Sequence, residues 1–283
     1  MGVKNKREAR CRNLVVISDT HAGCRLALCP PEGALLDDGG RYMPSKLQLS
    51  LWAWWEEFWG EWVPGVTHGE QFTVVHNGDA IDGKHHDSCT QISQNIEDQV
   101  ELAYRILAPV VKACGGRYYH VRGTEAHVGK SAQHEEALAK RLGAIPNSEG
   151  QHARWELWKE VGTGLVHFSH HIGTTGSNGY EATAVHRELI EAFTEAGRWG
   201  ERPPSVICRS HRHRCIETRI PVAGGGYATS FVTAGWQLKT PFAYRIAGAR
   251  QSQPQIGGSI IRQGDEELHT RHRVWSLARP VAE

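Results

Sequence analysis

The sequence predicts an α/β protein with one hydrophobic core. Three observations predict this class. Short apolar runs alternate with helical patterns in the first half, strand patterns dominate the second half, and no low-complexity linker separates them. Hydrophobic residues make up 40% of the 283 residues and charged residues 22%, which is typical of a folded chain. We therefore expect a basic N-terminal arm over residues 1–12 and a single domain over residues 13–283.

The first half alternates strands with helices. Asn13–Ser18 reads N-L-V-V-I-S, a continuous apolar run that ends in a polar cluster, as buried strands do. A loop between Gly33 and Gly40 precedes a helix over Lys46–Trp62, which Ser45 caps. The alternation then continues with a strand at 72–76, a helix at 93–113, a strand at 117–121 and a short helix at 131–142.

The helix over Lys46–Trp62 is rich in tryptophan. Its apolar positions on one helical face are 51, 55, 58, 59 and 62. Such a stripe indicates either a face that packs on the core or a platform on which nucleic-acid bases stack. Aromatic stripes at helical spacing usually pack, so we favour the core.

Strands dominate the second half. Strand patterns occupy 154–161 and 165–169, a helix follows over 180–196, and further strands are expected at 205–208, 215–220 and 228–234. A final hairpin covers 258–275, with its turn at Gly264-Asp265.

Composition excludes several classes of protein. Lysine plus arginine number 32 and aspartate plus glutamate 31, so the formal charge of +1 argues against a generally basic nucleic-acid-binding protein. No apolar run reaches the roughly 18 residues that a membrane helix needs. The seven cysteines form no C-x-x-C pair, which favours reduced thiols and a cytoplasmic location. The 17 histidines are the unusual feature, because histidine is the commonest metal ligand.

Many of these histidines follow predicted strands, together with carboxylates. Five strand ends carry such blocks, and they read S-D-T-H (18–21), G-D-A-I-D (78–82), G-T-E-A-H (123–127), H-H (170–171) and S-H-R-H (210–213). Ligand sites of open α/β sheets form at the carboxyl ends of strands. Imidazole and carboxylate ligands without thiolates suit Zn, Mn, Fe or Ni, and a carboxylate can bridge two such ions.

These blocks resemble the D-x-H, G-D-x-x-D, strand-end His and G-H-x-H motifs of calcineurin-like metallophosphoesterases, in the same order over residues 19–213. The resemblance implies a four-layer αββα sandwich, a catalytic domain over 13–283 and a dinuclear centre whose water-derived hydroxide attacks phosphorus. It also implies the ligands: Asp19, His21 and His213 for one metal, Asp79 as the catalytic bridging ligand, and His170 and His211 for the second metal.

The third block departs from the family's G-N-H-D/E. Thr124 stands in the place of the Asn ligand, whereas Glu125 offers the better ligand chemistry, and both alternatives stay open. His127 would then assist the leaving group. His171 is an alternative to His170, although His170 directly follows the strand and is favoured.

Basic residues near the same loops suit a phosphate-bearing substrate. Arg122 and Arg212 are the expected phosphate-binding residues, because a guanidinium group matches phosphate oxygens in a bidentate fashion. Asp82 is expected to orient a histidine and not to bind metal.

The expected function is metal-dependent hydrolysis of a phosphate mono- or diester with two divalent ions. The substrate could be a nucleotide. An alternative is a nucleic acid, in which case the protein would be a nuclease. The alternative from another class is a non-catalytic scaffold of the same fold that binds protein partners; the altered third block motivates it.

Overall fold

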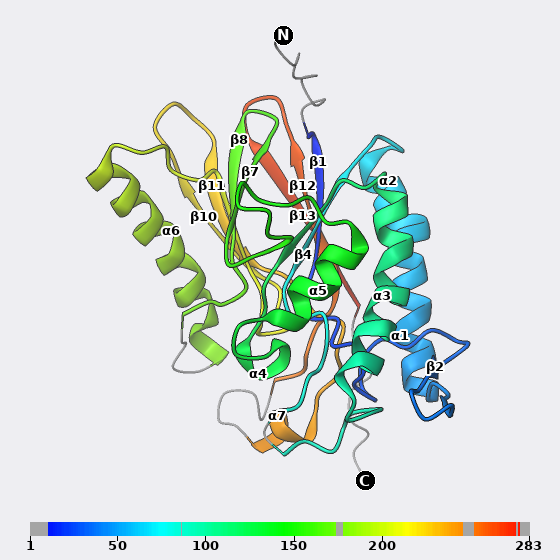
Figure 1. Ribbon diagram of the computed structural model, residues 1–283. Coiled ribbons are helices and arrows are strands. Elements are labelled where there is room, and N and C mark those ends of the chain that lie inside the picture. Colours follow the sequence, from blue (N-terminus) through cyan, green and yellow to red (C-terminus); the bar gives the residue numbers. More distant parts are fainter. Residues whose placement is uncertain (1–10, 86, 174–177, 246–251, 276, 278–283) are drawn as a thin grey trace.

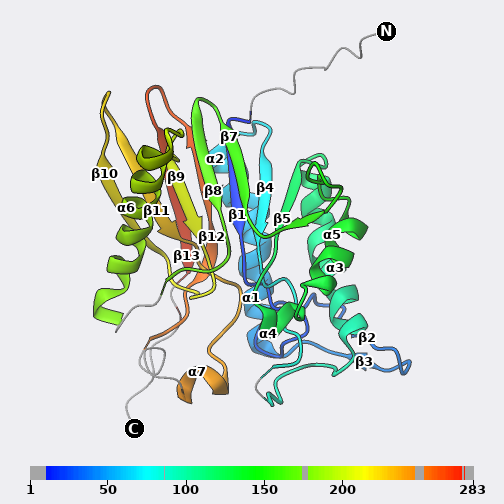
Figure 2. The same cartoon turned by 60° about the vertical axis from the view of Figure 1, so that its left-hand side comes forward.

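The computed structural model describes residues 11–85, 87–173, 178–245, 252–275 and 277. Two mixed β-sheets face each other, and helices cover the outer face of each (Figure 1). This is the four-layer αββα arrangement of an α/β protein. Figure 2 separates the layers, with α6 outside one sheet and α3 and α5 outside the other.

The first sheet has six strands within the described residues, in the order β13-β12-β1-β4-β5-β6. Their bounds are Asn13–Ile17 (β1), Thr73–Asn77 (β4), Tyr118–Val121 (β5), Ala153–Arg154 (β6), Ile256–Gln263 (β12) and Leu268–Trp275 (β13). Strands β1, β4, β5 and β6 are parallel, so their carboxyl ends meet at one edge of the sheet.

The second sheet has five strands within the described residues, in the order β10-β11-β9-β8-β7. Their bounds are Leu157–Val161 (β7), Gly164–Phe168 (β8), Val206–Arg209 (β9), Ile216–Pro221 (β10) and Tyr227–Val232 (β11). Strands β8, β9 and β11 are parallel, and the two outer strands β7 and β10 run antiparallel to their neighbours.

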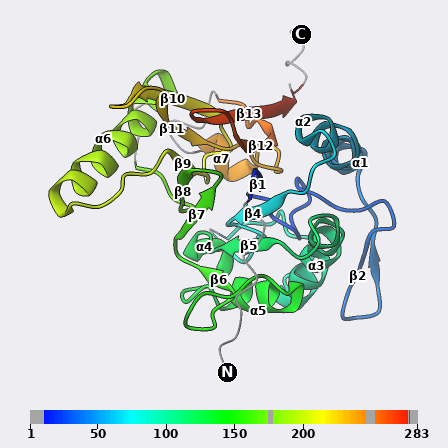
Figure 3. The same ribbon diagram turned by 90° about the horizontal axis from the view of Figure 1, so that it is seen from above.

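Longer helices cover both outer faces, as the view from above shows (Figure 3). The bounds of all helices in the described residues are Lys46–Glu57 (α1), Phe58–Trp62 (η1, a π-helix), Val63–Thr67 (α2), Ile96–Ala113 (α3), Glu125–Val128 (α4), Gln133–Leu142 (α5), Glu181–Trp199 (α6) and Pro241–Arg245 (α7), with a 3-10 turn at Asn178–Tyr180 (η2). The short helices α4 and α7 lie at one end of the sheets (Figure 2). One apolar cluster fills the space between the first sheet and its helices, a second lies between the sheets, and a small third lies under α6.

The predicted elements are present, and the structure adds the short helices α4 and α7 and differs in further details. The apolar pattern at 154–161 is two strands, β6 and β7, which belong to different sheets. The loop expected between Gly33 and Gly40 contains one strand and the turn of a small hairpin, in which Ala34–Leu35 (β2) pairs with Arg41–Tyr42 (β3). The helix that begins at Lys46 continues through the π-helical turn η1 into α2.

The tryptophan-rich helix packs on the core, as the spacing favoured. Leu51, Trp55 and Phe58 are buried, and Trp55 and Phe58 each make edge-to-face contacts with the buried Trp236. These rings therefore stabilise the layer and are not a surface on which bases could stack.

Within the described residues, no helix is long and apolar enough to span a membrane. All seven cysteines are free thiols. Most of the expected N-terminal arm, residues 1–10, lies outside the described residues.

Candidate metal centre

The turns that follow β1 and β4 run side by side at the carboxyl edge of the first sheet. The Asp19 amide donates to the Gly78 carbonyl (2.9 Å), and the His21 amide donates to the Asp79 carbonyl (3.1 Å). These bonds continue the parallel pairing of β1 and β4 beyond the strands. The two sequence blocks that start with Asp19 and Asp79 are thus brought together because their strands are neighbours.

Asn77, the last residue of β4, connects this edge to the second sheet. Its side-chain nitrogen Nδ2 donates to the Ser169 carbonyl (3.0 Å), which follows β8, and to Ser210 Oγ (2.7 Å), which follows β9. The histidines that follow Ser169 and Ser210 therefore face the carboxylates of the first sheet.

Two groups of three potential ligands result, and each has ligand atoms within 4.8 Å of one another. The first is Asp19, His21 and His213. Asp19 Oδ1 lies 3.2 Å from His213 Nε2 and 3.8 Å from His21 Nε2. The two ring nitrogens are 3.3 Å apart, close to the roughly 3.3 Å between two nitrogen ligands of a tetrahedral ion.

The second group is Asp79, His170 and His211. Asp79 Oδ2 lies 2.9 Å from His170 Nε2 and 3.9 Å from His211 Nδ1. Asp79 also forms a group with His21 and His127, so its carboxylate is within reach of both sets of ligands. This is the position that a bridging carboxylate requires.

The histidine rings are oriented by groups behind them. His170 Nδ1 donates to the Asn77 carbonyl (2.7 Å), and His127 Nδ1 donates to the Asp82 carbonyl (2.6 Å), which leaves Nε2 of each ring for the centre. Asp82 Oδ1 lies 3.5 Å from His21 Nδ1, and Gln91 and Gln237 hold both of its carboxylate oxygens. The expectation that Asp82 orients a histidine agrees with these contacts.

Backbone strain is concentrated at the same residues. Eight described residues other than glycine have a positive φ, and five of them are potential ligands: Asp19, His21, Asp79, His211 and His213. Such conformations cost about 1–3 kcal/mol each and persist where the surrounding structure imposes them, most often at functional sites.

The donor set fits a divalent cation. Asp19 Oδ1 and His170 Nε2 are buried and make no hydrogen bond, although each lies close to other ligand atoms. Burial disfavours the carboxylate of Asp79, but His170 and His127 hold its pKa well below its usual range. Burial likewise disfavours a charged His170, but Asp79 and Asp19 raise its pKa to about 10. Asp19 and Asp79 are two buried carboxylates, and buried negative charges need positive charge nearby. A bound metal ion would supply that charge.

His127 is neutral near pH 7. Burial lowers its pKa, the Asp79 carboxylate opposes this, and the neighbouring His21 and His85 lower it further, to about 4. Its Nε2 lies 4.0 Å from Asp79 Oδ2. Because Nδ1 carries the ring proton and donates it to the Asp82 carbonyl, Nε2 presents a lone pair to the centre.

Of the two candidates in the third block, Thr124 is the one at the centre. Its amide and its Oγ1 donate to the two Asp79 oxygens (2.6 and 3.0 Å), and Oγ1 lies 3.1 Å from His211 Nδ1. Glu125 begins α4 with an exposed side chain and is in none of the ligand groups found among the described residues. The loop turns into a helix at this point and does not bend to bring Glu125 inward.

His170 and His171 have different surroundings. His170 is buried against Asp79. His171 is exposed, and its ring contacts the rings of His170 and His211. The hydrogen bond from His170 to β4 sets this register.

The two arginines expected to bind phosphate have protein partners. Arg122 is buried, donates to the carbonyls of Ala153 and Ser131 and pairs with Glu136 (3.3 Å). Arg212 is half-buried and donates to the Gly173 carbonyl.

Sequence patterns did not indicate Glu135. Its carboxylate accepts the amides of Ala80 and Gly123, in the turns that carry Asp79 and Thr124. It lies in an ordinary helical stretch with no motif around it, so only the tertiary structure relates it to the centre.

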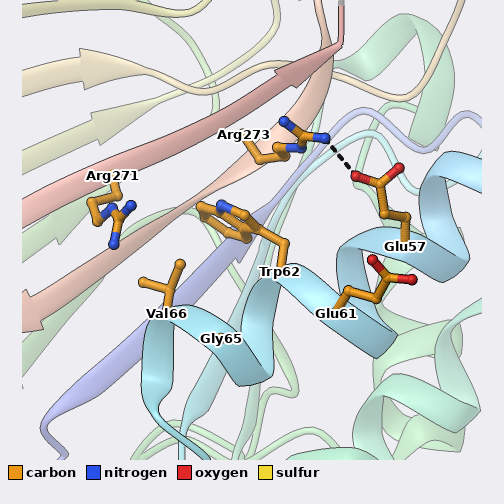
Figure 4. A pocket seen from close by; sticks show the side chains of 7 residues that line it. All are labelled: Glu57, Glu61, Trp62, Gly65, Val66, Arg271 and Arg273. Atoms are coloured by element: carbon orange, nitrogen blue, oxygen red, sulfur yellow. Dashed lines mark hydrogen bonds and ion pairs between the residues drawn. The ribbon is translucent and has the colours of Figure 1, made fainter.

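A hollow of about 330 Å³ lies elsewhere, between η1, α2 and the edge strand β13 (Figure 4). Its lining residues are Glu57, Glu61, Trp62, Gly65, Val66, Arg271 and Arg273, and Arg273 pairs with Glu57 across it. None of them belongs to the candidate metal centre.

No family model matches the chain, and no curated protein matches its sequence. Solved structures that align with it include a Vps29 mutant from Entamoeba histolytica, at 11% identity and TM-score 0.37, which covers 93% of this chain and 99% of that one. Vacuolar protein sorting 29 from Cryptosporidium parvum aligns at 9% identity and TM-score 0.36, over 95% and 100% of the two chains. A metallophosphoesterase from Sphaerobacter thermophilus aligns at 12% identity and TM-score 0.37, over 92% and 88%. These likenesses are of fold alone.

Proposed function

We propose that this protein is a metallophosphoesterase that hydrolyses a phosphate ester with two divalent metal ions. One observation carries the proposal: Asp79 lies within ligand distance of two separate sets of histidines, and the other carboxylate, Asp19, lies between them. Two ions so held would activate water as a nucleophile and stabilise the negative charge that develops at phosphorus.

The ligands divide between the two ions as follows. Asp19, His21 and His213 would hold one ion, His170 and His211 the other, and Asp79 would bridge them. The hydroxyl of Thr124 would fix the Asp79 carboxylate by its hydrogen bond. Asp82 and the Asn77 carbonyl would keep the rings of His21 and His170 in the orientation that presents Nε2.

His127 would handle a proton at the edge of the centre. The carbonyl of Asp82 fixes its ring, and Nε2 is the free atom on the side of Asp79. A ring held in this way can accept a proton on Nε2 and return it to a leaving oxygen.

The test is hydrolysis of aryl phosphate esters by the protein loaded with Mn²⁺ or Zn²⁺. We expect Asp79→Asn to lower kcat/KM about a thousandfold, or about 4 kcal/mol, because it weakens the contact to both ions. Asp98→Asn is the matched control. Asp98 is a buried carboxylate on α3 that accepts the Asp37 amide, and its variant should keep wild-type activity. Full activity and metal content in folded Asp79→Asn would refute the proposal.

The two classes of ester separate the possible substrates. Faster turnover of bis-aryl than of mono-aryl phosphate would favour a diesterase or nuclease, and the reverse would favour a monoesterase. The tryptophan-rich helix adds no support for a nuclease, since its rings pack in the core.

A scaffold of the same fold is the second candidate, and Thr124 in the place of an Asn ligand is the observation that favours it. Elemental analysis separates the two. Two metal ions per chain support the enzyme, whereas a folded protein that binds no Mn²⁺ or Zn²⁺ supports the scaffold.

A further inference from the structure

A second buried cluster lies next to the candidate metal centre, on β4, β5 and α5. It consists of His76, His120 and Glu135, which are fully buried and have ligand atoms within 4.8 Å of one another. Two of its ring nitrogens, His76 Nδ1 and His120 Nε2, make no hydrogen bond. The cluster thus has the composition of another metal site.

Its geometry argues against one. The rings of His76 and His120 are stacked, with centroids 4.9 Å apart and planes only 8° apart. An imidazole binds a metal through a lone pair in its own plane, at about 2.0–2.1 Å. Lone pairs in two parallel planes do not converge on one ion, so these rings cannot share a metal without rotating.

The contacts of Glu135 indicate a different role. Oε1 accepts the amide of Ala80 (2.9 Å), and Oε2 accepts the amide of Gly123 (2.5 Å). His120 Nε2 lies 3.4 Å from Oε1 on the remaining side. One buried carboxylate therefore holds two turns, which follow β4 and β5.

Those turns carry the bridging ligand and its partner. Asp79 precedes Ala80 and has a strained φ of 57°, and Thr124 follows Gly123 and donates to Asp79. The turns are in direct contact, because a Cβ on Gly123 would lie 2.1 Å from Asp79 Oδ1 and 2.2 Å from its amide nitrogen. A small displacement of either turn would therefore move the Asp79 carboxylate.

We propose that Glu135 is a positioning residue that fixes the Asp79 carboxylate for metal binding by holding the Ala80 and Gly123 amides. The inference rests on the proposed function only in taking Asp79 as a metal ligand. Glu135 itself touches neither metal nor substrate. Groups behind the ligands commonly change metal affinity 10–100-fold when mutated, about the effect expected here.

The chain offers a matched control in the next residue. Glu136, also on α5, accepts two backbone amides, those of His152 (2.9 Å) and Ala153 (2.8 Å). The segment that it holds, at His152 and Ala153, carries no candidate ligand of the centre. A loss of Mn²⁺ affinity that follows only from weaker hydrogen bonds should therefore appear in both Glu135→Gln and Glu136→Gln. A loss of Mn²⁺ affinity that follows from a displaced Asp79 should appear in Glu135→Gln alone.

The experiment is calorimetric titration of the metal-depleted full-length chain with Mn²⁺, for the wild type and both variants, together with thermal unfolding. We expect Glu135→Gln to bind Mn²⁺ at least about tenfold more weakly. Glu136→Gln should stay within about twofold of the wild type, even where the two variants lose similar thermal stability. Excess Mn²⁺ should restore ester hydrolysis by Glu135→Gln with an unchanged KM, which a purely structural defect would not allow.

Mn²⁺ binding by folded Glu135→Gln within twofold of the wild type would overturn the inference. Should that variant not fold, Glu135→Asp is the substitute, because its shorter chain keeps the charge but cannot span both amides; it should show the same loss. If neither folds, Glu135 is a structural residue and the inference fails. A wild type that binds Mn²⁺ but hydrolyses no ester refutes the proposed function alone, and the comparison of variants still decides the role of Glu135.

Discussion

Asp79 connects the two halves of the candidate metal centre. Its carboxylate accepts two hydrogen bonds from Thr124 and lies against the ring of His170, while its backbone takes a left-handed conformation. Such strain persists only when neighbouring contacts impose it. Here the Ala80 amide is held by Glu135, the Thr124 amide donates to Asp79, and Gly123 lies close to the Asp79 backbone. The strain at this residue is thus explained by the position that its carboxylate must take.

The third sequence block gives a prediction at this scale. Thr124→Val removes the hydroxyl that donates to Asp79 Oδ2 and keeps the shape of the side chain. A hydrogen bond to a charged group contributes about 1.5–3 kcal/mol, so we expect metal affinity and ester hydrolysis to fall about tenfold or more. Mn²⁺ titration and steady-state kinetics measure both.

Glu125→Gln is the comparison. Its side chain is exposed at the start of α4, so metal affinity should stay within about twofold of the wild type. A larger loss for Glu125→Gln than for Thr124→Val would show that Glu125 is the ligand and Thr124 is not.

At the scale of elements, α1 supports the loop that follows Asp19 and His21 of the candidate metal centre. Ser45 and Gln48 form a capping box at its start, in which each side chain accepts the backbone amide of the other residue. The Gln48 amide group also donates to the carbonyls of Cys24 and Ala27, just beyond His21. The start of one helix thus stabilises a loop of the centre.

Loss of the cap should affect stability. We expect Ser45→Ala to lower the free energy of unfolding by about 1 kcal/mol, because the amide of Gln48 loses its acceptor. Urea unfolding followed by circular dichroism measures this. Ser50→Ala is the control on the same helix, since the exposed Ser50 donates to the Lys46 carbonyl of its own helix. Its effect should stay within about 0.5 kcal/mol. Equal effects would exclude a specific contribution of the cap.

At the scale of the molecule, a half-buried ion pair joins the two sheets. His272 on β13 lies 2.9 Å from Glu217 on β10, and Ser259 lies 2.8 Å from the other ring nitrogen of His272. Burial lowers the pKa of His272, but Cys215 and Glu217 raise it to about 9. Burial raises the pKa of Glu217, but hydrogen bonds from His272, Thr270 and Arg219 lower it to about 2.

This pair makes stability depend on pH. Because the pKa of His272 is raised above its usual 6.5, its contribution is complete below pH 6.5 and is lost as the pH rises through about 9. The lowered pKa of Glu217 makes its contribution complete above pH 4.5 and lost as the pH falls through about 2. We therefore expect Glu217→Gln to lower the free energy of unfolding by about 2 kcal/mol at pH 6 and clearly less at pH 10.

Urea unfolding at the two pH values measures the difference. The control is Glu195→Gln, which breaks an exposed pair with Arg198 and should cost about 0.5 kcal/mol or less at either pH. An effect of Glu217→Gln that is equal at pH 6 and pH 10 would contradict the role assigned to His272.

The sequence alone determined the class of fold and indicated most of the residues that form the candidate metal centre. Apolar runs such as Asn13–Ile17 and Thr73–Asn77 are buried on both faces of the sheet. Their local composition is therefore sufficient to predict them as strands. Polar residues that directly follow such runs must lie at the carboxyl edge of a parallel sheet. This reasoning groups Asp19 with Asp79, which follow two strands of the first sheet. His170 follows β8 of the second sheet, and the packing of the two sheets brings it to them.

The tertiary structure decided what depends on contacts between distant segments. It divided residues 154–161 between two sheets, turned Glu125 outward at the start of α4 and engaged Arg122 with Glu136. It also brought Glu135 to the backbone of two turns 55 and 12 residues away in the chain. Local patterns encode which face of an element is buried, but the partner of a buried charge is set by packing, and no periodicity in the sequence records it.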